Sequence, residues 1–140
     1  MKEKLDKQLV QDYPLLYSDR YVGMRSTAMC WGFECGDGWE PLIRNLSKRL
    51  EKYIAALPLP TEKQKEYFGG NGLPRATQVK EKFGTLRFYM THSTMKMDRA
   101  IRKAEKMSQY ICENCGQPGK LYTDGWCMVR CDNCYKSDKD

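Results

Sequence analysis

Four cysteines in the last third of the chain carry the clearest chemical signal in the sequence. They form two pairs, each with a two-residue gap, and fifteen residues separate the pairs: Cys112, Cys115, Cys131 and Cys134. A two-residue gap lets both thiolates of a pair turn toward one point, and four thiolates complete a tetrahedral shell around Zn²⁺. Because four protein ligands leave no position for water, the spacing predicts a structural zinc ion that staples the fold.

Other interpretations of the cysteines stay open. An iron centre could use the same four thiolates, or the four could be free or disulfide-bonded. Cys127, between the pairs, is interpreted as a packing residue, with a substitute ligand as the alternative. Cys30 and Cys35 have no second pair nearby, so we expect buried free thiols there. A second metal site at these two would need His92 or Cys127 to reach them.

The residues between the cysteine pairs predict a short hairpin. Asp124-Gly125 is a turn signal, and the flanking segments 120–123 and 126–130 would bring Cys131 back to Cys112. Gly116, after the first pair, allows the backbone to bend round the ion. We therefore expect a zinc module of zinc-ribbon or treble-clef-like type over 112–140, appended to an α+β domain over 1–111.

Two amphipathic helices dominate that domain. The first begins after Asp37 or Gly38, either of which could cap it, has Pro41 in its first turn and stops at 58–60. The second runs from about 95 to 111, because apolar residues recur there at intervals of three and four. A shorter helix is expected over 2–10. The sequence does not settle 15–36, and the glycines at 69, 70 and 72 with Pro74 predict an irregular loop over 61–77.

Residues 78–91 predict a β-hairpin that turns at Gly84-Thr85. In this register Phe83 lies opposite Leu86 on an apolar face, together with Phe88. Glu81 falls on the same face, where an unpaired carboxylate would be costly. Its candidate partners are three arginines: Arg20, Arg25 and Arg44.

The other face of the hairpin is cationic and aromatic, and we take it as the candidate ligand site: Lys80, Lys82, Arg87 and Tyr89. The register places Lys82 opposite Arg87, and like charges facing each other call for a negative group. Either Glu62 and Glu66 supply it, or a phosphate does, with Tyr89 as a stacking surface for a base. The alternative is a solvated strand face.

Charge and composition narrow the function. The 140 residues carry a net charge of +6, and residues 80–120 alone carry +5. This clustering favours an anionic partner. A basic stripe on the second helix could extend a phosphate-binding strip, although such a stripe is also typical of a solvated helix face: Arg99, Arg102, Lys103 and Lys106.

Several classes are excluded or disfavoured. No apolar run approaches the roughly 18 residues of a membrane span, and residues 1–12 are charged with no apolar segment behind them, so we expect neither a spanning nor a secreted protein. His92 is the only histidine, and no nucleophile motif or Walker-type loop occurs. We therefore expect no enzyme.

Several motifs are similar to those of one protein family. They are Gly36-Asp37-Gly38-Trp39-Glu40, the run QVKEKFGTLRFY from Gln78 to Tyr89, Cys112-Glu-Asn-Cys115-Gly and the final Gly125-Trp126 hairpin. Over about residues 12–134 the chain thereby resembles a family of small, mostly uncharacterised bacteriophage proteins. The resemblance implies a viral origin and a host-cytoplasm location. It makes two roles plausible, a nucleic-acid-binding accessory protein and a counter-defence protein that sequesters a host nucleotide signal.

Together these patterns predict a non-enzymatic, zinc-stapled α+β protein that binds a phosphate-bearing ligand. A small nucleotide is favoured, because the charge is modest and concentrated on one strand face. A DNA- or RNA-binding accessory protein is the first alternative. The second is a protein–protein adaptor, monomeric or homo-oligomeric, that uses the Tyr-, Trp- and Met-rich first 40 residues.

Overall fold

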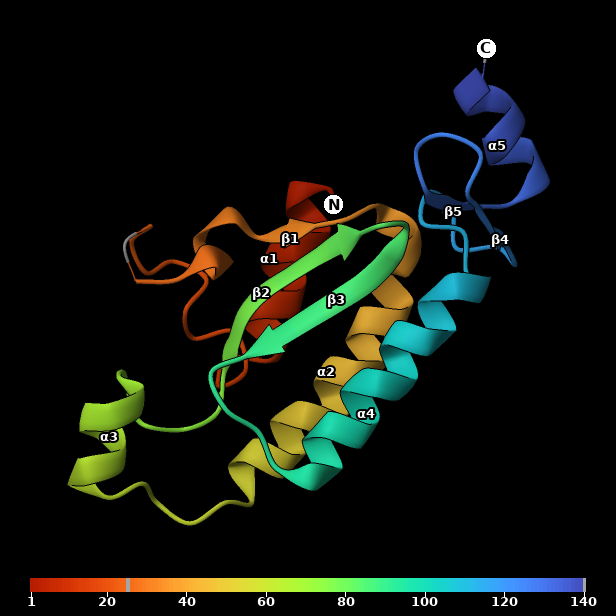
Figure 1. Ribbon diagram of the computed structural model, residues 1–140. Coiled ribbons are helices and arrows are strands. Elements are labelled where there is room, and N and C mark those ends of the chain that lie inside the picture. Colours follow the sequence, from red (N-terminus) through yellow and green to blue (C-terminus); the bar gives the residue numbers. More distant parts are fainter. Residues whose placement is uncertain (25, 140) are drawn as a thin grey trace.

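The structure, a computed structural model, describes residues 1–24 and 26–139. A three-stranded sheet in the order β1-β2-β3 is combined with five α-helices and a separate two-stranded hairpin (Figure 1). The α+β class predicted from the sequence is therefore confirmed. In chain order the elements are α1 (Glu3–Asp12), β1 (Phe33–Glu34), α2 (Glu40–Ala55), α3 (Glu62–Phe68), β2 (Ala76–Lys82), β3 (Thr85–Met90), α4 (Met95–Met107), β4 (Lys120–Tyr122), β5 (Met128–Arg130) and α5 (Asp132–Lys139).

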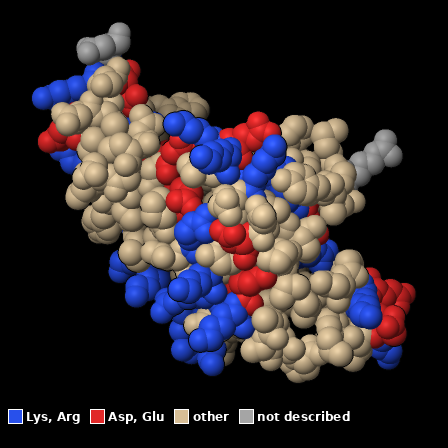
Figure 2. All heavy atoms as spheres, turned by 180° about the vertical axis from the view of Figure 1, so that it is seen from behind, with Lys and Arg blue, Asp and Glu red and all other residues tan. Residues whose placement is uncertain are grey.

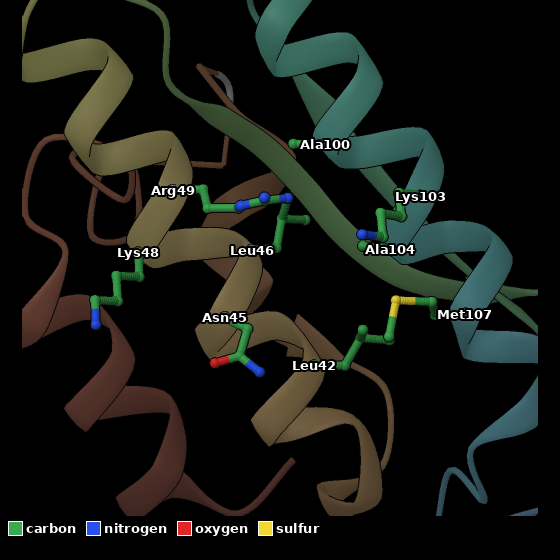
Figure 3. A pocket seen from close by; sticks show the side chains of 9 residues that line it. All are labelled: Leu42, Asn45, Leu46, Lys48, Arg49, Ala100, Lys103, Ala104 and Met107. Carbon is green, nitrogen blue, oxygen red and sulfur yellow. The ribbon is translucent and has the colours of Figure 1, made fainter.

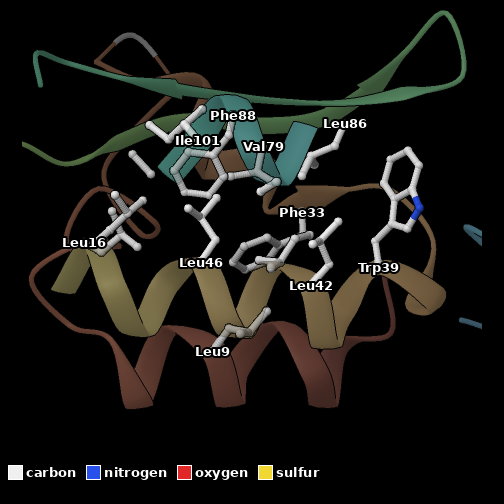
Figure 4. Close-up of a cluster of buried hydrophobic side chains, with 14 of the residues drawn as sticks. Leu9, Leu16, Phe33, Trp39, Leu42, Leu46, Val79, Leu86, Phe88 and Ile101 are labelled. Carbon is white, nitrogen blue, oxygen red and sulfur yellow. The ribbon is translucent and has the colours of Figure 1, made fainter. Parts of the chain in front are cut away.

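The core lies between the sheet and its helices. Helices α2 and α4 run side by side against one face of the sheet, and α1 packs against α2 (Figure 1). Leu46 and Ile101 from the helices meet Val79, Leu86 and Phe88 from the strands (Figure 4). All five are buried. The hairpin face that is apolar in the sequence is thus the face that the helices cover.

The two amphipathic helices are confirmed as α2 and α4. Pro41 stands in the first turn of α2, where its missing N–H costs no hydrogen bond. Neither Asp37 nor Gly38 caps this helix, because a 3₁₀ turn over Asp37–Trp39 leads directly into it. Helix α4 is capped by the Thr94 hydroxyl, which accepts a hydrogen bond from the amide of Met97.

Helix α3 corrects the expectation of an irregular loop over 61–77. Thr61 and Gln64 form a capping box, in which each side chain accepts a hydrogen bond from the backbone N–H of the other. Gly69, with φ of +76°, ends the helix. The following segment is held by buried Arg75, whose Nε donates to Asp19 at 2.8 Å and whose other nitrogens donate to the carbonyls of Phe68 and Gly69.

The predicted hairpin forms, but its predicted turn is wrong by one residue. Phe83 and Gly84 occupy the two central turn positions, with φ of +53° and +87°, which is the pattern of a type I′ turn. Phe83 is therefore exposed at the tip and does not face Leu86. Lys80, rather than Lys82, lies opposite Arg87. Every pair shifts by two residues, so the division into an apolar and a cationic face is preserved.

Glu81 is accommodated on the apolar face by its own turn. Its carboxylate accepts a hydrogen bond from the amide of Gly84 at 2.6 Å. Of its predicted arginine partners, Arg20 pairs with Asp6 at 2.9 Å, Arg44 pairs elsewhere on the surface, and Arg25 lies outside the described residues.

The outer edge of β3 is closed by side chains. The amide of Leu86 donates to the hydroxyl of Ser108 at 3.0 Å, and the amide of Phe88 donates to the carboxylate of Glu105 at 2.9 Å. Both acceptors come from α4 and the 3₁₀ turn that follows it. These two outward-pointing amides are satisfied without another strand.

The corrected register separates two phenylalanines that the sequence had grouped together. We predict that Phe88→Ala lowers the free energy of unfolding by about 3 to 5 kcal/mol, because it removes a buried ring from the core. Phe83→Ala should change it by less than about 1 kcal/mol, because the ring is exposed. Urea melts of both variants check this. Equal losses for the two would show that Phe83 is buried in solution.

Candidate metal centre

The four predicted ligands come together at one end of the molecule. The sulfur atoms of Cys112, Cys115, Cys131 and Cys134 all lie within 4.8 Å of one another, and the Sγ atoms of Cys115 and Cys131 are 3.6 Å apart. With Zn–S bonds of about 2.3 Å, a tetrahedral site has sulfurs about 3.8 Å apart. The cluster therefore fits a four-coordinate thiolate metal site.

Two different local structures supply the cysteine pairs. Cys112 and Cys115 flank a tight turn that continues through Gly116, whose φ of +83° bends the chain as predicted. The β4–β5 hairpin follows, and α5 begins directly after Cys131, so that Cys134 lies in its first turn (Figure 1). We call this segment the cysteine module. Of the two predicted module types, this order of turn, hairpin and helix is the treble-clef-like one.

Hydrogen bonds within the cluster shift the pKa values of two of the thiols. Burial raises the pKa of Cys112, but backbone hydrogen bonds from Cys131, Cys115 and Asn114 outweigh it and bring the pKa to about 7. Hydrogen bonding to Cys131 raises the pKa of Cys134 to about 12. Four thiolates this close repel one another, so full ionisation requires a cation among them.

The first cysteine pair is docked onto the segment that precedes α2. Gly38 donates its amide to the carbonyl of Glu113 at 2.7 Å, and Gly36 donates to the Glu113 carboxylate at 2.8 Å. The indole N–H of Trp39, which is fully buried, donates to the carbonyl of Ile111 at 2.9 Å. Three residues of the first domain thus bind the residues on either side of Cys112.

Both glycines in this contact are required by space. A Cβ atom on Gly38 would overlap the carbonyl oxygens of Cys112 and Glu113, and one on Gly36 would overlap that of Glu113. Val129 of the cysteine module also belongs to the main hydrophobic core. The two predicted domains therefore share hydrogen bonds and core, while the boundary at 111/112 stays a prediction.

The other cysteines do not join a metal cluster. Among the described residues, the four-cysteine group is the single set of three or more close ligands. Burial raises the pKa of the Cys35 thiol to about 12, which makes it inert. His92 stacks on Phe68 with ring centroids 3.6 Å apart and shares a hydrogen bond with Thr91. The alternative second metal site at Cys30 and Cys35 is therefore not formed.

The predicted ligand residues share the open face of the sheet. Lys80, Lys82, Arg87 and Tyr89 all lie on the face that the helices leave uncovered. Their negative neighbour is Glu34 of β1, which pairs in register with Lys80, rather than Glu62, which pairs with Lys65 on α3. The Nε atom of Arg87 is buried without a hydrogen-bond partner in the described structure. Lys82 alone of the four borders one of the clefts described here.

The structure has a second cationic surface, of which the sequence predicted only the part on α4. A shallow groove of about 360 Å³ runs between α2 and α4 (Figure 3). An adjoining hollow of about 210 Å³ extends it. We call the two the α2–α4 groove. Five cations and no carboxylate line it: Lys48, Arg49, Lys96, Arg99 and Lys103. Seen from behind, Lys and Arg side chains gather over this side of the molecule (Figure 2).

The sequence showed the α4 residues as a basic stripe, but it did not show that α2 adds Lys48 and Arg49 beside them. The close spacing of Lys48, Arg49 and Lys52 along α2 was the available signal, and it becomes informative once the two helices are known to lie side by side.

Comparisons with known proteins identify no relative. No family model, no curated protein and no solved structure matches the chain. The resemblance to a bacteriophage family therefore stays a prediction. None of the described helices is long and apolar enough to cross a membrane.

We expect the metal to stabilise both the cysteine module and the segment around Trp39 that contacts it. We predict about one zinc per chain by elemental analysis, and its loss in Cys131→Ser. Metal loss should also red-shift the tryptophan emission, because the buried indole of Trp39 is hydrogen-bonded to the carbonyl of Ile111, next to Cys112. Trp31 and Trp126 are already exposed, so their emission should change little. Cys30→Ser is the matched control and should keep the metal. Purified protein without any transition metal would contradict the assignment.

The docking contact should affect metal binding from a distance. We predict that Gly38→Ala weakens metal retention in a chelator competition, because the added Cβ pushes the first cysteine pair away from α2. Gly23→Ala is the control, since nothing lies within 4 Å of a Cβ there. Parent-like metal retention in Gly38→Ala would show that the module folds without this contact.

Proposed function

We propose that the protein is a non-enzymatic module, stapled by a structural zinc ion, that binds the phosphate backbone of a nucleic acid in the α2–α4 groove. The observation that carries this proposal is a set of exposed cations on two adjacent helices that have no ion-pair partner in the part of the chain that the structure describes. Anionic polymers bind such surfaces by displacing counterions.

The charge imbalance arises because the acids of these helices are used elsewhere. Glu40 pairs with Arg44, and Glu51 accepts hydrogen bonds from the amides of Leu15 and Leu16. Asp98 bonds the Ser93 hydroxyl, and Glu105 accepts from the amide of Phe88. Eight exposed cations on α2 and α4 are left without an ion pair among the described residues: Lys48, Arg49, Lys52, Lys96, Arg99, Arg102, Lys103 and Lys106.

The groove brings like charges together. Arg49 from α2 and Lys103 from α4 reach toward each other above Ala100 and Ala104 (Figure 3). Because Ala100 and Ala104 have small side chains, the space between the two cations stays open, and an anion could approach both cations at once. In the absence of an anion this arrangement is repulsive, and a phosphate would relieve the repulsion.

Zinc is the metal that we propose for the four-cysteine site. Four thiolates in a closed tetrahedral arrangement suit Zn²⁺ and leave no open position for chemistry at the metal. The ion would then hold the β4–β5 hairpin and α5 against the end of α4, and the binding surface would consist of protein side chains.

The hairpin face supports a second candidate function, the binding of a small nucleotide. The unpartnered Nε of Arg87 and the neighbouring Lys80 favour a phosphate there. This face is an open sheet surface, however, whereas small ligands are usually bound in enclosed pockets. Sequestration of a host nucleotide signal would depend on this candidate and on the bacteriophage resemblance.

Removal of two groove cations tests the main proposal. In Arg49→Ala/Lys103→Ala, we predict weaker binding to a short DNA duplex and a slope of log K against log salt that is smaller by about 2, because each lost phosphate contact removes about one unit. Fluorescence anisotropy at several salt concentrations measures both quantities. Stability in urea should be unchanged or slightly higher, since repulsion is relieved.

Lys4→Ala/Lys63→Ala is the matched control. It removes the same charge from exposed positions on α1 and α3, outside the groove, and should keep the parent salt slope. If the groove variant binds DNA with the parent affinity and slope, the groove is a solvated surface. The protein–protein adaptor would then be the leading interpretation.

A further inference from the structure

Two hairpin tips present aromatic side chains to the same cleft. Phe83, at the tip of β2–β3, is 70% exposed, and Trp126, at the tip of β4–β5, is 83% exposed. Both line a cleft of about 480 Å³, together with Glu81, Lys82, Gly125 and Cys127. Large aromatic rings gain most from burial, so two of them left open beside one cleft require an explanation.

Phe83 adopts a conformation that its residue type does not favour. Its φ of +53° lies in the left-handed region, where Gly, Asn and Asp are preferred and a bulky residue is an outlier. Asn-Gly is the usual sequence of such a turn. Because the ring is exposed, burial in the protein does not compensate for the strain. Strained residues of this kind cluster at ligand sites.

The distance between the two tips is fixed by packing. Gly84 is buried against the β4–β5 hairpin, and a Cβ atom on it would lie 3.1 Å from the amide nitrogen of Met128 and 3.2 Å from the carbonyl carbon of Cys127. The cleft is therefore preformed by contact between the sheet and the cysteine module.

We propose that this cleft binds a nucleobase that carries a phosphate, with the base stacked on Phe83 and Trp126 and the phosphate at Lys82. Sequence-tolerant stacking on aromatic rings is the common way in which proteins hold unpaired bases. Lys82, at the rim, supplies the complementary charge, and its Nζ lies 5.7 Å from the centre of the Phe83 ring. The volume suits one nucleotide.

Glu81 adds a polar group to the lining of this cleft. One of its carboxylate oxygens accepts from Gly84, and the other has no hydrogen-bond donor among the described residues. It could accept a hydrogen bond from a base amino group. The site is separate from the α2–α4 groove, and the proposal does not depend on that groove.

The base could belong to a free nucleotide or to an unpaired residue of a strand, and two pairs of probes distinguish these sources. Adenosine 5′-monophosphate is compared with ribose 5-phosphate, and a short thymidine oligonucleotide is compared with an abasic strand of the same length. Each pair keeps the phosphate and removes the base. We expect quenching of tryptophan fluorescence by the base-containing probe of at least one pair, and by neither base-free probe.

Three variants assign the binding to the cleft. Trp126→Leu and Phe83→Asn should each weaken binding about 5- to 100-fold, as expected for loss of a base–aromatic stack. Phe83→Asn should also raise the melting temperature, because asparagine tolerates the left-handed turn. Trp31→Leu is the matched control, since Trp31 is exposed at 63% but lies outside the cleft, and it should bind like the parent.

Calorimetry measures the affinities of the Trp126→Leu protein, which lacks the fluorescent reporter. The proposal is overturned if no base-containing probe quenches the tryptophan fluorescence of the parent, if the base-free probes quench it equally, or if Trp31→Leu loses as much affinity as Trp126→Leu. Salt-dependent duplex binding in the α2–α4 groove would persist in all of these cases, so failure here is distinguishable from failure of the proposed function.

Discussion

The contact between Gly36–Trp39 and the backbone around Cys112 is the interaction on which the rest of the structure depends. It joins the start of α2 to the first cysteine pair through hydrogen bonds from Gly36, Gly38 and Trp39. The acceptors are backbone carbonyls and a single carboxylate, so they are in place only when residues 111–113 are correctly folded. A metal at the cysteines and the burial of Trp39 therefore stabilise each other.

The carboxylates and the cations of α2 and α4 have different structural roles. Three carboxylates on or beside α2 and α4 accept hydrogen bonds from the backbone of other elements: Glu51, Glu105 and Glu113. The acids thereby hold the strands, the loop before α2 and the cysteine module in place. Eight cations of the same helices are left facing solvent without an ion pair among the described residues. The basic surface therefore results from the way the fold is assembled rather than from an unusually high net charge.

The elements with strong local signals could be predicted from the sequence. Helices α2 and α4 follow from their apolar periodicity, and the metal ligands follow from the spacing of the cysteine pairs. Helix α3 also had a local signal, the capping box of Thr61 and Gln64, but the following glycines concealed it. The turn was misplaced because Phe83 adopts a φ that its residue type predicts against.

Other features depend on tertiary structure alone. The part-buried pair Asp6–Arg20 and the buried pair Asp19–Arg75 join residues that are 14 and 56 positions apart, and neither spacing carries a signal. The α2 half of the groove and the cleft between the two hairpins likewise exist only once separate elements have packed together. Surfaces formed in this way are where single-sequence reasoning is weakest.

The closed edge of β3 has a consequence for behaviour in concentrated solution. An open strand edge is a template on which a second molecule can add its own strand, the usual route to fibrils and to exchanged dimers. Here Ser108 and Glu105 occupy the outward amides of Leu86 and Phe88 with side-chain oxygens, and these cannot propagate a ladder. These two amides of β3 are thereby withheld from pairing with a strand of a second molecule.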